Sequence, residues 1–195
     1  MNEIMEYQEL KERLQAIPNN QERALLCTIY ACMARVSEIV GNALTKRPGI
    51  STKDGAADSR RLVLKIMTLK TNKPRKITLF RNREAWLIKE IEEYAAQGEG
   101  TMFPGMSRWK AARIFKKHFP EFSSNRTGNK AASKHTIHWL RGWRYTHYRR
   151  GNITGKRVEG RVASLLGGWA TSATPEKYYD FTKIDDFEAE LENAI

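Results

Sequence analysis

The sequence contains little cysteine and no long apolar run. Its two cysteines, Cys27 and Cys32, lie five residues apart within an apolar stretch. This is not the spacing of a zinc-binding or redox motif, so we expect two buried, reduced thiols. No segment is apolar over the length that a membrane-spanning helix needs, and no signal peptide opens the chain. We therefore expect an intracellular protein, of the cytoplasm, the nucleoid or a host cell, with no membrane partner.

Acidic residues are scarce relative to basic ones. The chain has 22 Asp and Glu against 34 Lys and Arg, which gives a formal net charge of +12. Such an excess predicts a polyanionic partner. The basic residues are spread over several segments together with Trp and Tyr, and no single basic amphipathic helix carries them, which disfavours a membrane surface.

The hydrophobic pattern predicts an α+β domain that is mainly helical, and the length of 195 residues favours one domain. Residues 22–33 are apolar at nearly every position, which predicts a helix in the middle of the domain. Residues 62–69 and 76–80 are strand-like, with a turn at 71–74 between them, and form the best predicted β-hairpin. Further helices are expected over residues 2–17, 84–96, 108–118, 138–150 and 156–166. Asn20 is the expected N-cap of the apolar helix, and Ser107 is that of the helix 108–118.

The last residues, 182–195, differ from the rest in composition. They hold five acidic side chains and one Lys, with Phe187, Leu191 and Ile195 at positions i, i+4 and i+8. This pattern predicts an acidic amphipathic helix with a narrow apolar stripe, which docks on the body or on a neighbouring copy. We therefore divide the chain into a domain over residues 1–181 and a tail over 182–195.

Two pairs of side chains are candidates for binding an anion. His138 and Arg141 are three residues apart, so on a helix they share one face and can present an imidazole and a guanidinium to one anion. Arg35 follows the apolar helix, and Glu38 is three residues further on, where its carboxylate can hold the guanidinium.

Two clusters of basic side chains are candidates for contacts with DNA phosphates. A cationic hairpin tip suits contact with a phosphate or a groove, and a helix with one packed face and one basic face suits the backbone. The residues are Lys70, Lys73, Arg75 and Lys76 at the hairpin, and Arg108, Lys110 and Arg113 on the helix 108–118.

Four short segments, followed by a tyrosine, occur in a particular order. They are Ala34-Arg35-Val36-Ser37-Glu38-Ile39, Lys70-Thr71-Asn72-Lys73-Pro74-Arg75, His138-Trp139-Leu140-Arg141, and Leu165-Leu166-Gly167-Gly168-Trp169 with Tyr178 nine residues after Trp169. In this order they resemble the catalytic domain of tyrosine recombinases, the phage-integrase family, over roughly residues 8–180. The resemblance implies an integrase-type catalytic domain over residues 1–181 and a site-specific recombinase.

The resemblance also implies a reaction. The hydroxyl of Tyr178 attacks a DNA phosphodiester and leaves a 3′-phosphotyrosyl bond and a free 5′-hydroxyl. Ionising a free Tyr at neutral pH costs on the order of 4 kcal/mol, because its pKa is about 10. Arg35 and Arg141 bind the non-bridging oxygens and neutralise the transition state, which suits the planar guanidinium better than an ammonium group.

The remaining roles follow from the same resemblance. Lys70 is the general acid that protonates the leaving 5′-oxygen. His138 assists proton removal from Tyr178 or binds a phosphate oxygen, and the indole N–H of Trp169 donates to the phosphate. Glu38 orients Arg35 and takes no part in the chemistry. No metal or other cofactor is required.

Double-stranded DNA is the partner that the resemblance implies. Relatives assemble four copies on two duplexes and exchange a C-terminal segment between neighbours. We therefore expect a homotetramer or a dimer on DNA, held together through the tail over residues 182–195.

Several assignments have rivals. Tyr179 competes with Tyr178 as the nucleophile, Lys73 and Lys76 compete with Lys70, and Trp169 is alternatively a packing residue. After Arg141 the family commonly has His-Thr, whereas this chain has Gly142-Trp143. The alternatives for the whole protein are a non-catalytic integrase-like DNA-binding protein and a nicking-closing enzyme like the type IB topoisomerases.

Overall fold

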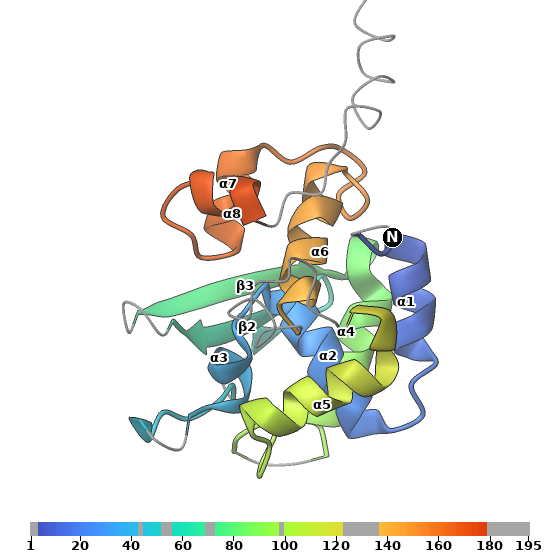
Figure 1. Cartoon of the computed structure of the whole chain (residues 1–195), viewed down its shortest axis with the longest axis vertical. Helices are drawn as coiled ribbons and strands as arrows, with labels where there is room; N and C mark the ends of the chain where they lie inside the picture. Colours follow the sequence, from blue (N-terminus) through green and yellow to red (C-terminus); the bar gives the residue numbers. More distant parts are fainter. Residues whose placement is uncertain are drawn as a thin grey trace, which may run out of the picture.

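Helices make up most of the molecule, and a small sheet lies along one side (Figure 1). The computed structural model describes residues 4–42, 45–51, 56–68, 73–97, 100–122 and 137–178. In chain order the helices are α1 (Tyr7–Gln15), α2 (Asn20–Cys32), α3 (Val36–Val40), α4 (Arg81–Ala95), α5 (Arg108–His118), the 3-10 turn η3 (Pro120–Phe122), α6 (Trp139–Arg149), α7 (Gly160–Leu166) and α8 (Ala173–Tyr178).

The described strands are β1 (Ala56–Ala57), β2 (Arg61–Met67) and β3 (Pro74–Phe80), which form an antiparallel sheet in that order. Leu64 pairs with Ile77, and both are buried between more exposed neighbours, because successive strand residues point to opposite faces. The predicted hairpin is therefore confirmed, and so is the predicted fold class, mainly α with a small antiparallel sheet.

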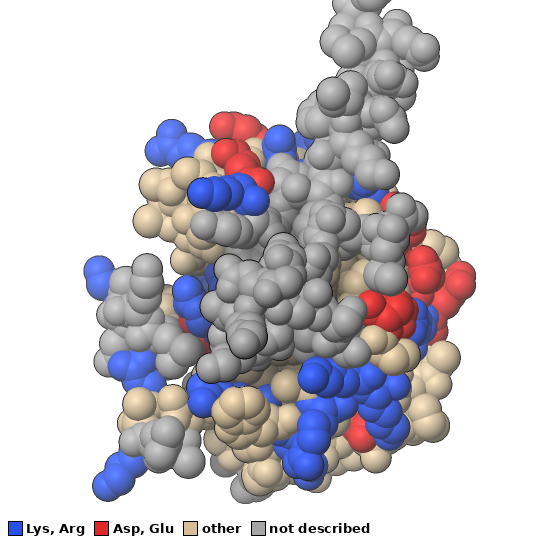
Figure 2. All heavy atoms as spheres, in the orientation of Figure 1, with Lys and Arg blue, Asp and Glu red and all other residues tan. Residues whose placement is uncertain are grey.

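Helix α5 has one packed face and one basic face. It starts where predicted, since the Ser107 hydroxyl accepts a hydrogen bond from the backbone N–H of Lys110 at 3.1 Å. Ala111, Ile114 and Phe115 are buried on the inner face. Lys and Arg side chains gather over the part of the surface in Figure 2 where α5 runs.

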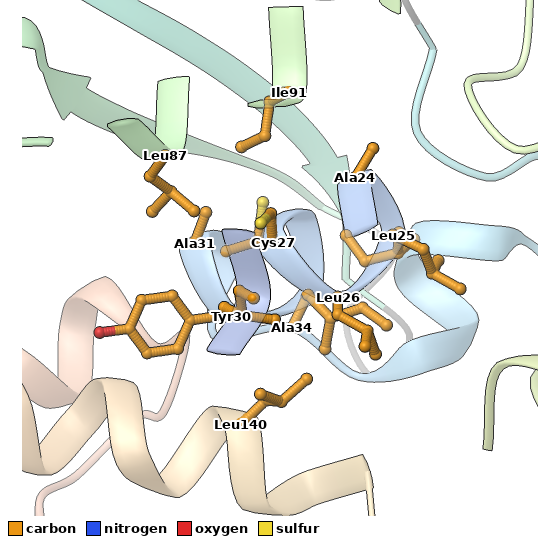
Figure 3. Close-up of a cluster of buried hydrophobic side chains, with 14 of the residues drawn as sticks. Ala24, Leu25, Leu26, Cys27, Tyr30, Ala31, Ala34, Leu87, Ile91 and Leu140 are labelled. Atoms are coloured by element: carbon orange, nitrogen blue, oxygen red, sulfur yellow. The ribbon is translucent and has the colours of Figure 1, made fainter. Parts of the chain in front are cut away.

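Helix α2 lies in the middle of the hydrophobic core. Every residue from Ala24 to Cys32 is buried. Leu87 and Ile91 of α4 pack on one side of the helix and Leu140 of α6 lies on another (Figure 3). The predicted central helix is confirmed, and its lack of a polar face reflects contact with neighbouring elements around it.

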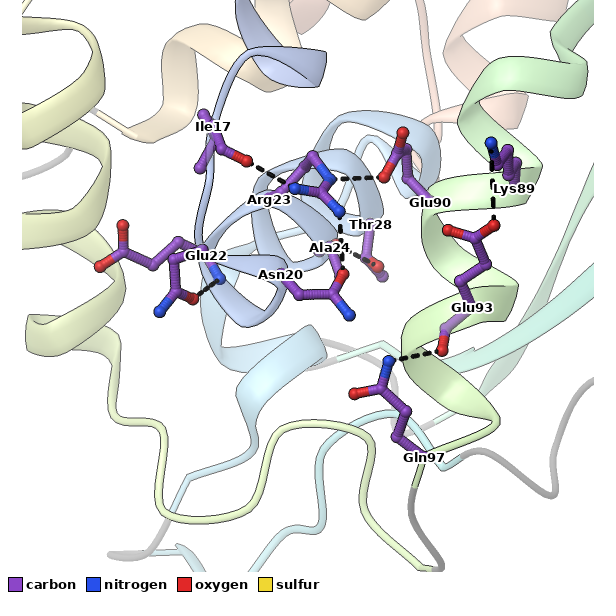
Figure 4. Close-up of polar contacts among 11 residues, drawn as sticks. Ile17, Asn20, Glu22, Arg23, Ala24, Thr28, Lys89, Glu90, Glu93 and Gln97 are labelled. Atoms are coloured by element: carbon purple, nitrogen blue, oxygen red, sulfur yellow. Dashed lines mark hydrogen bonds and ion pairs between the residues drawn. The ribbon is translucent and has the colours of Figure 1, made fainter.

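Polar side chains fix the start of α2 (Figure 4). The N-cap is Asn19, whose side-chain oxygen accepts from the backbone N–H of Glu22 at 2.9 Å, so the predicted cap at Asn20 is wrong by one residue. The amide oxygen of Asn20 instead accepts from Arg23 at 3.2 Å. Arg23 also donates to the Glu90 carboxylate at 2.5 Å, which joins α2 to α4.

Helices α7 and α8 lie together next to α6, above β3 in the view of Figure 1. Helix α7 begins at Gly160, four residues later than the predicted start at residue 156. The reason is a backbone contact: the N–H of Val158 donates to the Tyr148 carbonyl of α6 at 3.1 Å, which holds this segment out of the helix.

The first turn of α4 contains a kink that holds an ion pair in the core. The predicted helix start, Glu84, lies inside α4 with non-helical φ and ψ of −133° and 32°. Its carboxylate pairs with Arg144 of α6, and both side chains are buried. Arg144 also donates to the Tyr148 hydroxyl at 2.9 Å and lies over the Tyr30 ring at 4.9 Å. Burial lowers the pKa of Arg144, but Glu84 together with Tyr148 and Tyr30 outweighs burial, so the pKa lies well above its ordinary value.

His147 is buried beside this pair. Its Nε2 lies 2.9 Å from the Met5 carbonyl, which can only accept, so Nε2 carries the proton. Its Nδ1 then accepts from the Tyr30 hydroxyl at 2.8 Å. Burial, together with the charge of Arg144, lowers the pKa of His147 to about 3. The ring is therefore neutral in the folded protein across the usual pH range.

This neutral histidine makes stability depend on pH. In the unfolded chain the pKa of His147 is near its ordinary value of 6.5, so below that pH the unfolded state binds a proton that the folded state does not. Stability must therefore fall as pH falls towards 3, by up to about 1.4 kcal/mol per pH unit for this group. We expect His147→Gln to flatten the dependence by about 1 kcal/mol per unit between roughly pH 6 and pH 4, measured by urea unfolding. Parallel curves for the two proteins would contradict this assignment.

Cys27 and Cys32 are free and buried, as predicted. Burial raises the pKa of the Cys32 thiol to about 12 and raises that of Cys27 as well. Among the helices in the described ranges, none has both the length and the apolar character needed to cross a membrane.

Candidate functional site

Arg35 is the N-cap residue of α3 and lies three residues after the end of α2. Its guanidinium is 3.2 Å from the Glu38 carboxylate, which also accepts from the backbone N–H of Arg35 at 2.8 Å. The Glu38 side chain is 2% exposed and that of Arg35 is 34% exposed. The contact expected between the two is present: a buried carboxylate holds a guanidinium that still reaches solvent.

Arg141 lies in the first turn of α6 and is 3% exposed. Its Nη2 donates to the Gly167 carbonyl at 2.8 Å, and its guanidinium lies 3.9 Å from the centre of the Trp169 ring. Stacking on an aromatic face and bonding to a carbonyl together fix the plane of the guanidinium. Two segments of the predicted motif, 26 residues apart in sequence, are therefore in direct contact.

His138 is the N-cap residue of α6 and so precedes the helix that was predicted to contain it. Its φ and ψ of −67° and −12° are close to helical, so His138 and Arg141 keep the i, i+3 relation of one helical turn. Both lie at the N-terminal end of α6, where the helix dipole favours an anion.

Gly167 and Gly168 form a tight turn after α7. A Cβ at Gly167 would lie 1.7 Å from the Trp169 ring, because the indole folds back over this residue. Gly168 has a φ of +74°, which favours glycine, and a Cβ there would lie 2.9 Å from Nε of Arg75. The turn needs both glycines to bring Trp169 onto Arg141.

Arg75 was predicted to contact DNA from the hairpin tip, but its side chain is directed into the body. Its Nη1 donates to the Leu166 carbonyl, and its Nη2 donates to the Cys32 carbonyl at 3.0 Å. Burial lowers its pKa, with a further contribution in the same direction from nearby Arg35. Sequence reasoning assigned Arg75 by its basic neighbours. The strand alternation, which separates it from the exposed Lys76, was the signal that could have distinguished it.

These contacts bring distant parts of the chain together. The carbonyls of the consecutive residues Leu166 and Gly167 bind Arg75 and Arg141, respectively. The other nitrogen of Arg75 binds the Cys32 carbonyl, three residues before Arg35. Three guanidinium groups and the Glu38 carboxylate therefore gather around the end of α2 and the turn after α7, which leaves an excess of positive charge suited to an anionic ligand.

Other predicted residues lie partly or wholly outside the described structure. Lys70 and Tyr179 are outside it, and so is the tail over residues 182–195. The backbone of Tyr178 ends α8, a helix that contacts α6, while its side chain is outside the description. Lys73 and Lys76, near the hairpin turn and on β3, are exposed.

The basic face of α5 is exposed to solvent at Arg108, Lys110 and Arg113, as predicted. Trp109 beside them is 61% exposed, and the Arg108 guanidinium lies 4.8 Å from its ring centre. A pocket of about 510 Å³ lies between this end of α5 and α3, with Ser37 on its wall. Within the described ranges, no group of three or more His, Cys, Asp and Glu residues is placed to hold a metal ion.

The comparisons with known proteins concern the fold. No protein-family model matches the sequence, and no curated protein matches it. Among solved structures the chain is similar to XerH site-specific recombinase in a post-cleavage complex with palindromic difH substrate, with a TM-score of 0.61 and 17% identity, covering 97% of this chain and 52% of that one. It is also similar to XerH in a pre-cleavage complex with difH substrate, with a TM-score of 0.59 and 18% identity, covering 98% and 51%.

The chain thus spans about half the length of the XerH chains that it matches. A likeness at this level of identity concerns architecture, and it agrees with the fold expected from the four ordered sequence segments. The chain has the fold of the catalytic half of a tyrosine-type site-specific recombinase, with XerH as a solved example of it.

Proposed function

We propose that the protein cleaves and rejoins double-stranded DNA through a 3′-phosphotyrosyl intermediate, as a tyrosine-type site-specific recombinase. The observation that carries this proposal is the gathering of Arg35, Arg75 and Arg141 around the end of α2 and the turn after α7. Arg75 bonds to the Cys32 and Leu166 carbonyls, Arg141 bonds to the Gly167 carbonyl, and Arg35 is close enough to act on the charge of Arg75. The likeness to a recombinase captured before and after cleavage supports it through the fold.

Arg35 and Arg141 bind the non-bridging oxygens of the attacked phosphate. The Gly167 carbonyl and the Trp169 ring fix the guanidinium of Arg141, and Glu38 fixes that of Arg35. Such groups are already oriented when charge develops in the transition state, so little reorganisation is needed during the reaction. The N-terminal end of α6 adds a favourable dipole at the same position.

Tyr178 is the nucleophile in this proposal, carried on α8 beside α6. Lys70, which follows β2 and precedes β3 in the sequence, protonates the leaving 5′-oxygen. His138 accepts the phenol proton or binds a phosphate oxygen. Trp169 donates its indole N–H to the phosphate while its ring supports Arg141.

The DNA duplex lies against two groups of basic side chains. Lys73 and Lys76 contact phosphates from the hairpin, and Arg108, Lys110 and Arg113 contact them from α5. The protein acts inside a cell as a dimer or tetramer on DNA, held together by the tail over residues 182–195. These contacts position the duplex, while Arg35 and Arg141 act on one phosphate.

A trapped covalent adduct tests the function directly. The protein is incubated with a pool of duplexes of randomised sequence, each nicked near its centre so that a cleaved strand is lost and religation is blocked. We expect an SDS-stable protein–DNA adduct, with mass spectrometry locating a nucleotide on the peptide that contains Tyr178. Retention of DNA without any adduct would favour a binding protein. Relaxation of supercoiled plasmid without exchange of partners would favour a nicking-closing enzyme.

A further inference from the structure

We propose that Arg75 is a positioning residue that holds the β2–β3 hairpin, and with it the general acid, against the rest of the active site. This inference rests on the proposed function. One guanidinium on β3 bonds to the carbonyl ends of two helices, Cys32 at the end of α2 and Leu166 at the end of α7. These bonds join the hairpin to the segment that leads into Arg35 and to the turn that leads into Trp169.

The Arg75 side chain connects backbone carbonyls of two different helices. Its Nη1 and Nη2 are both directed at carbonyls, and its Nε is buried with no hydrogen-bond partner among the described residues. Gly168 packs directly against this side chain, since a Cβ there would meet Nε at 2.9 Å. Such a side chain offers little to a DNA phosphate but fixes the distance between three elements.

Arg75 joins the turn end of the hairpin to the body of the molecule through two hydrogen bonds to backbone carbonyls. The backbone N–H of Thr68 donates to the Lys73 carbonyl at 3.0 Å. This bond joins the residue after β2 to the residue before β3 and does not involve the rest of the molecule. Arg75, two residues beyond Lys73, is the nearest described position at which the hairpin bonds to α2 and α7. A displacement of about 1 Å in a reacting group can lower a rate about 100-fold, so this anchor is expected to matter for the step that Lys70 serves.

The test compares Arg75→Ala with its strand neighbour Lys76→Ala, whose side chain is exposed. Single-turnover adduct formation is measured at saturating protein, on a duplex recovered from the randomised pool. We expect Arg75→Ala to lower the rate about 100-fold. Binding of the uncleaved duplex should stay within about threefold, with an unchanged salt dependence, because no phosphate contact is lost. Lys76→Ala removes a proposed phosphate contact, so it should instead weaken binding and reduce the slope of log K against log salt by about one contact.

A second substrate isolates the step. In a duplex with sulfur in place of the bridging 5′-oxygen, the leaving group is a thiolate that departs without protonation, so the general acid is bypassed. The Arg75→Ala defect should shrink to less than about tenfold on this substrate, as should that of Lys70→Ala. If the sulfur substrate restores the rate of Lys70→Ala while Arg75→Ala is equally slow on both substrates, the role proposed for Arg75 is wrong. The proposed function would still stand. A wild-type protein that forms no adduct would overturn both.

A further variant guards against simple unfolding. Arg75→Lys keeps the charge but has one nitrogen where two carbonyls must be bound, so it should remain strongly impaired if geometry is the cause. Full activity of Arg75→Lys would show that charge alone suffices and would contradict a positioning role. Thermal melting of each variant confirms that the protein is folded.

Discussion

Tyr178→Phe is expected to abolish formation of the covalent protein–DNA adduct and to leave binding of the duplex nearly unchanged. The substitution removes the phenolic oxygen, which is the atom that would bond to phosphorus, and keeps the ring. Because the arginines and the basic side chains of α5 remain, contacts with the phosphate backbone persist. The measurement is the amount of SDS-stable adduct on a nicked suicide duplex, with gel-shift binding to the intact duplex in parallel.

The matched control is Tyr179→Phe, which removes the same atom one residue further on. It should form adduct at close to the normal rate. If Tyr178→Phe still forms adduct and Tyr179→Phe does not, the nucleophile is Tyr179. If both variants form adduct, neither is the nucleophile, and the proposed mechanism fails.

Glu84→Gln is expected to lower the free energy of unfolding by about 3 kcal/mol, because it leaves the buried Arg144 guanidinium without its counter-charge. Gln has the same shape as Glu, so packing at the kink of α4 is kept and the loss is electrostatic. Arg144 lies among the Tyr30 and Tyr148 rings with its side chain fully buried, and so water cannot replace the carboxylate. Urea unfolding followed by circular dichroism measures the change, which is large against a total stability of about 5–15 kcal/mol.

The double variant Glu84→Gln, Arg144→Met is the control for this prediction. Removing the second charge takes away the uncompensated group, so the double variant should recover much of the stability lost by the single one. A double variant less stable than Glu84→Gln alone would mean that the guanidinium stabilises the core through its ring and hydroxyl contacts. The ion pair would then be secondary.

Local signals predicted much of the fold. The apolar run of residues 22–33 was enough to identify α2 as the central helix, because burial on all sides leaves no polar stripe. The hairpin followed from its strand-like runs around a turn, and the cap at Ser107 from its residue type. The pair of Arg35 and Glu38 was visible from a spacing of three residues.

Features that depend on distant partners were not predictable in this way. Nothing local distinguishes Glu84 as a kink that reaches Arg144, since the two are 60 residues apart. Arg75 looked like its basic neighbours, and its partners Cys32 and Leu166 lie far from it in sequence. The resemblance placed Arg141 and Trp169 in the same site but did not predict that they touch. Their stacking results from the tight turn at Gly167 and Gly168.

The two inert thiols have a practical consequence for following the protein in motion. Cys27 and Cys32 are buried where α2 packs against its neighbours, so reagents in solution do not reach them. At neutral pH both thiols are almost entirely protonated. Maleimide dyes should therefore ignore the native chain. A single cysteine introduced on the surface could carry a fluorophore without first removing the natural ones, which makes the hairpin and α8 accessible to distance measurements on individual molecules.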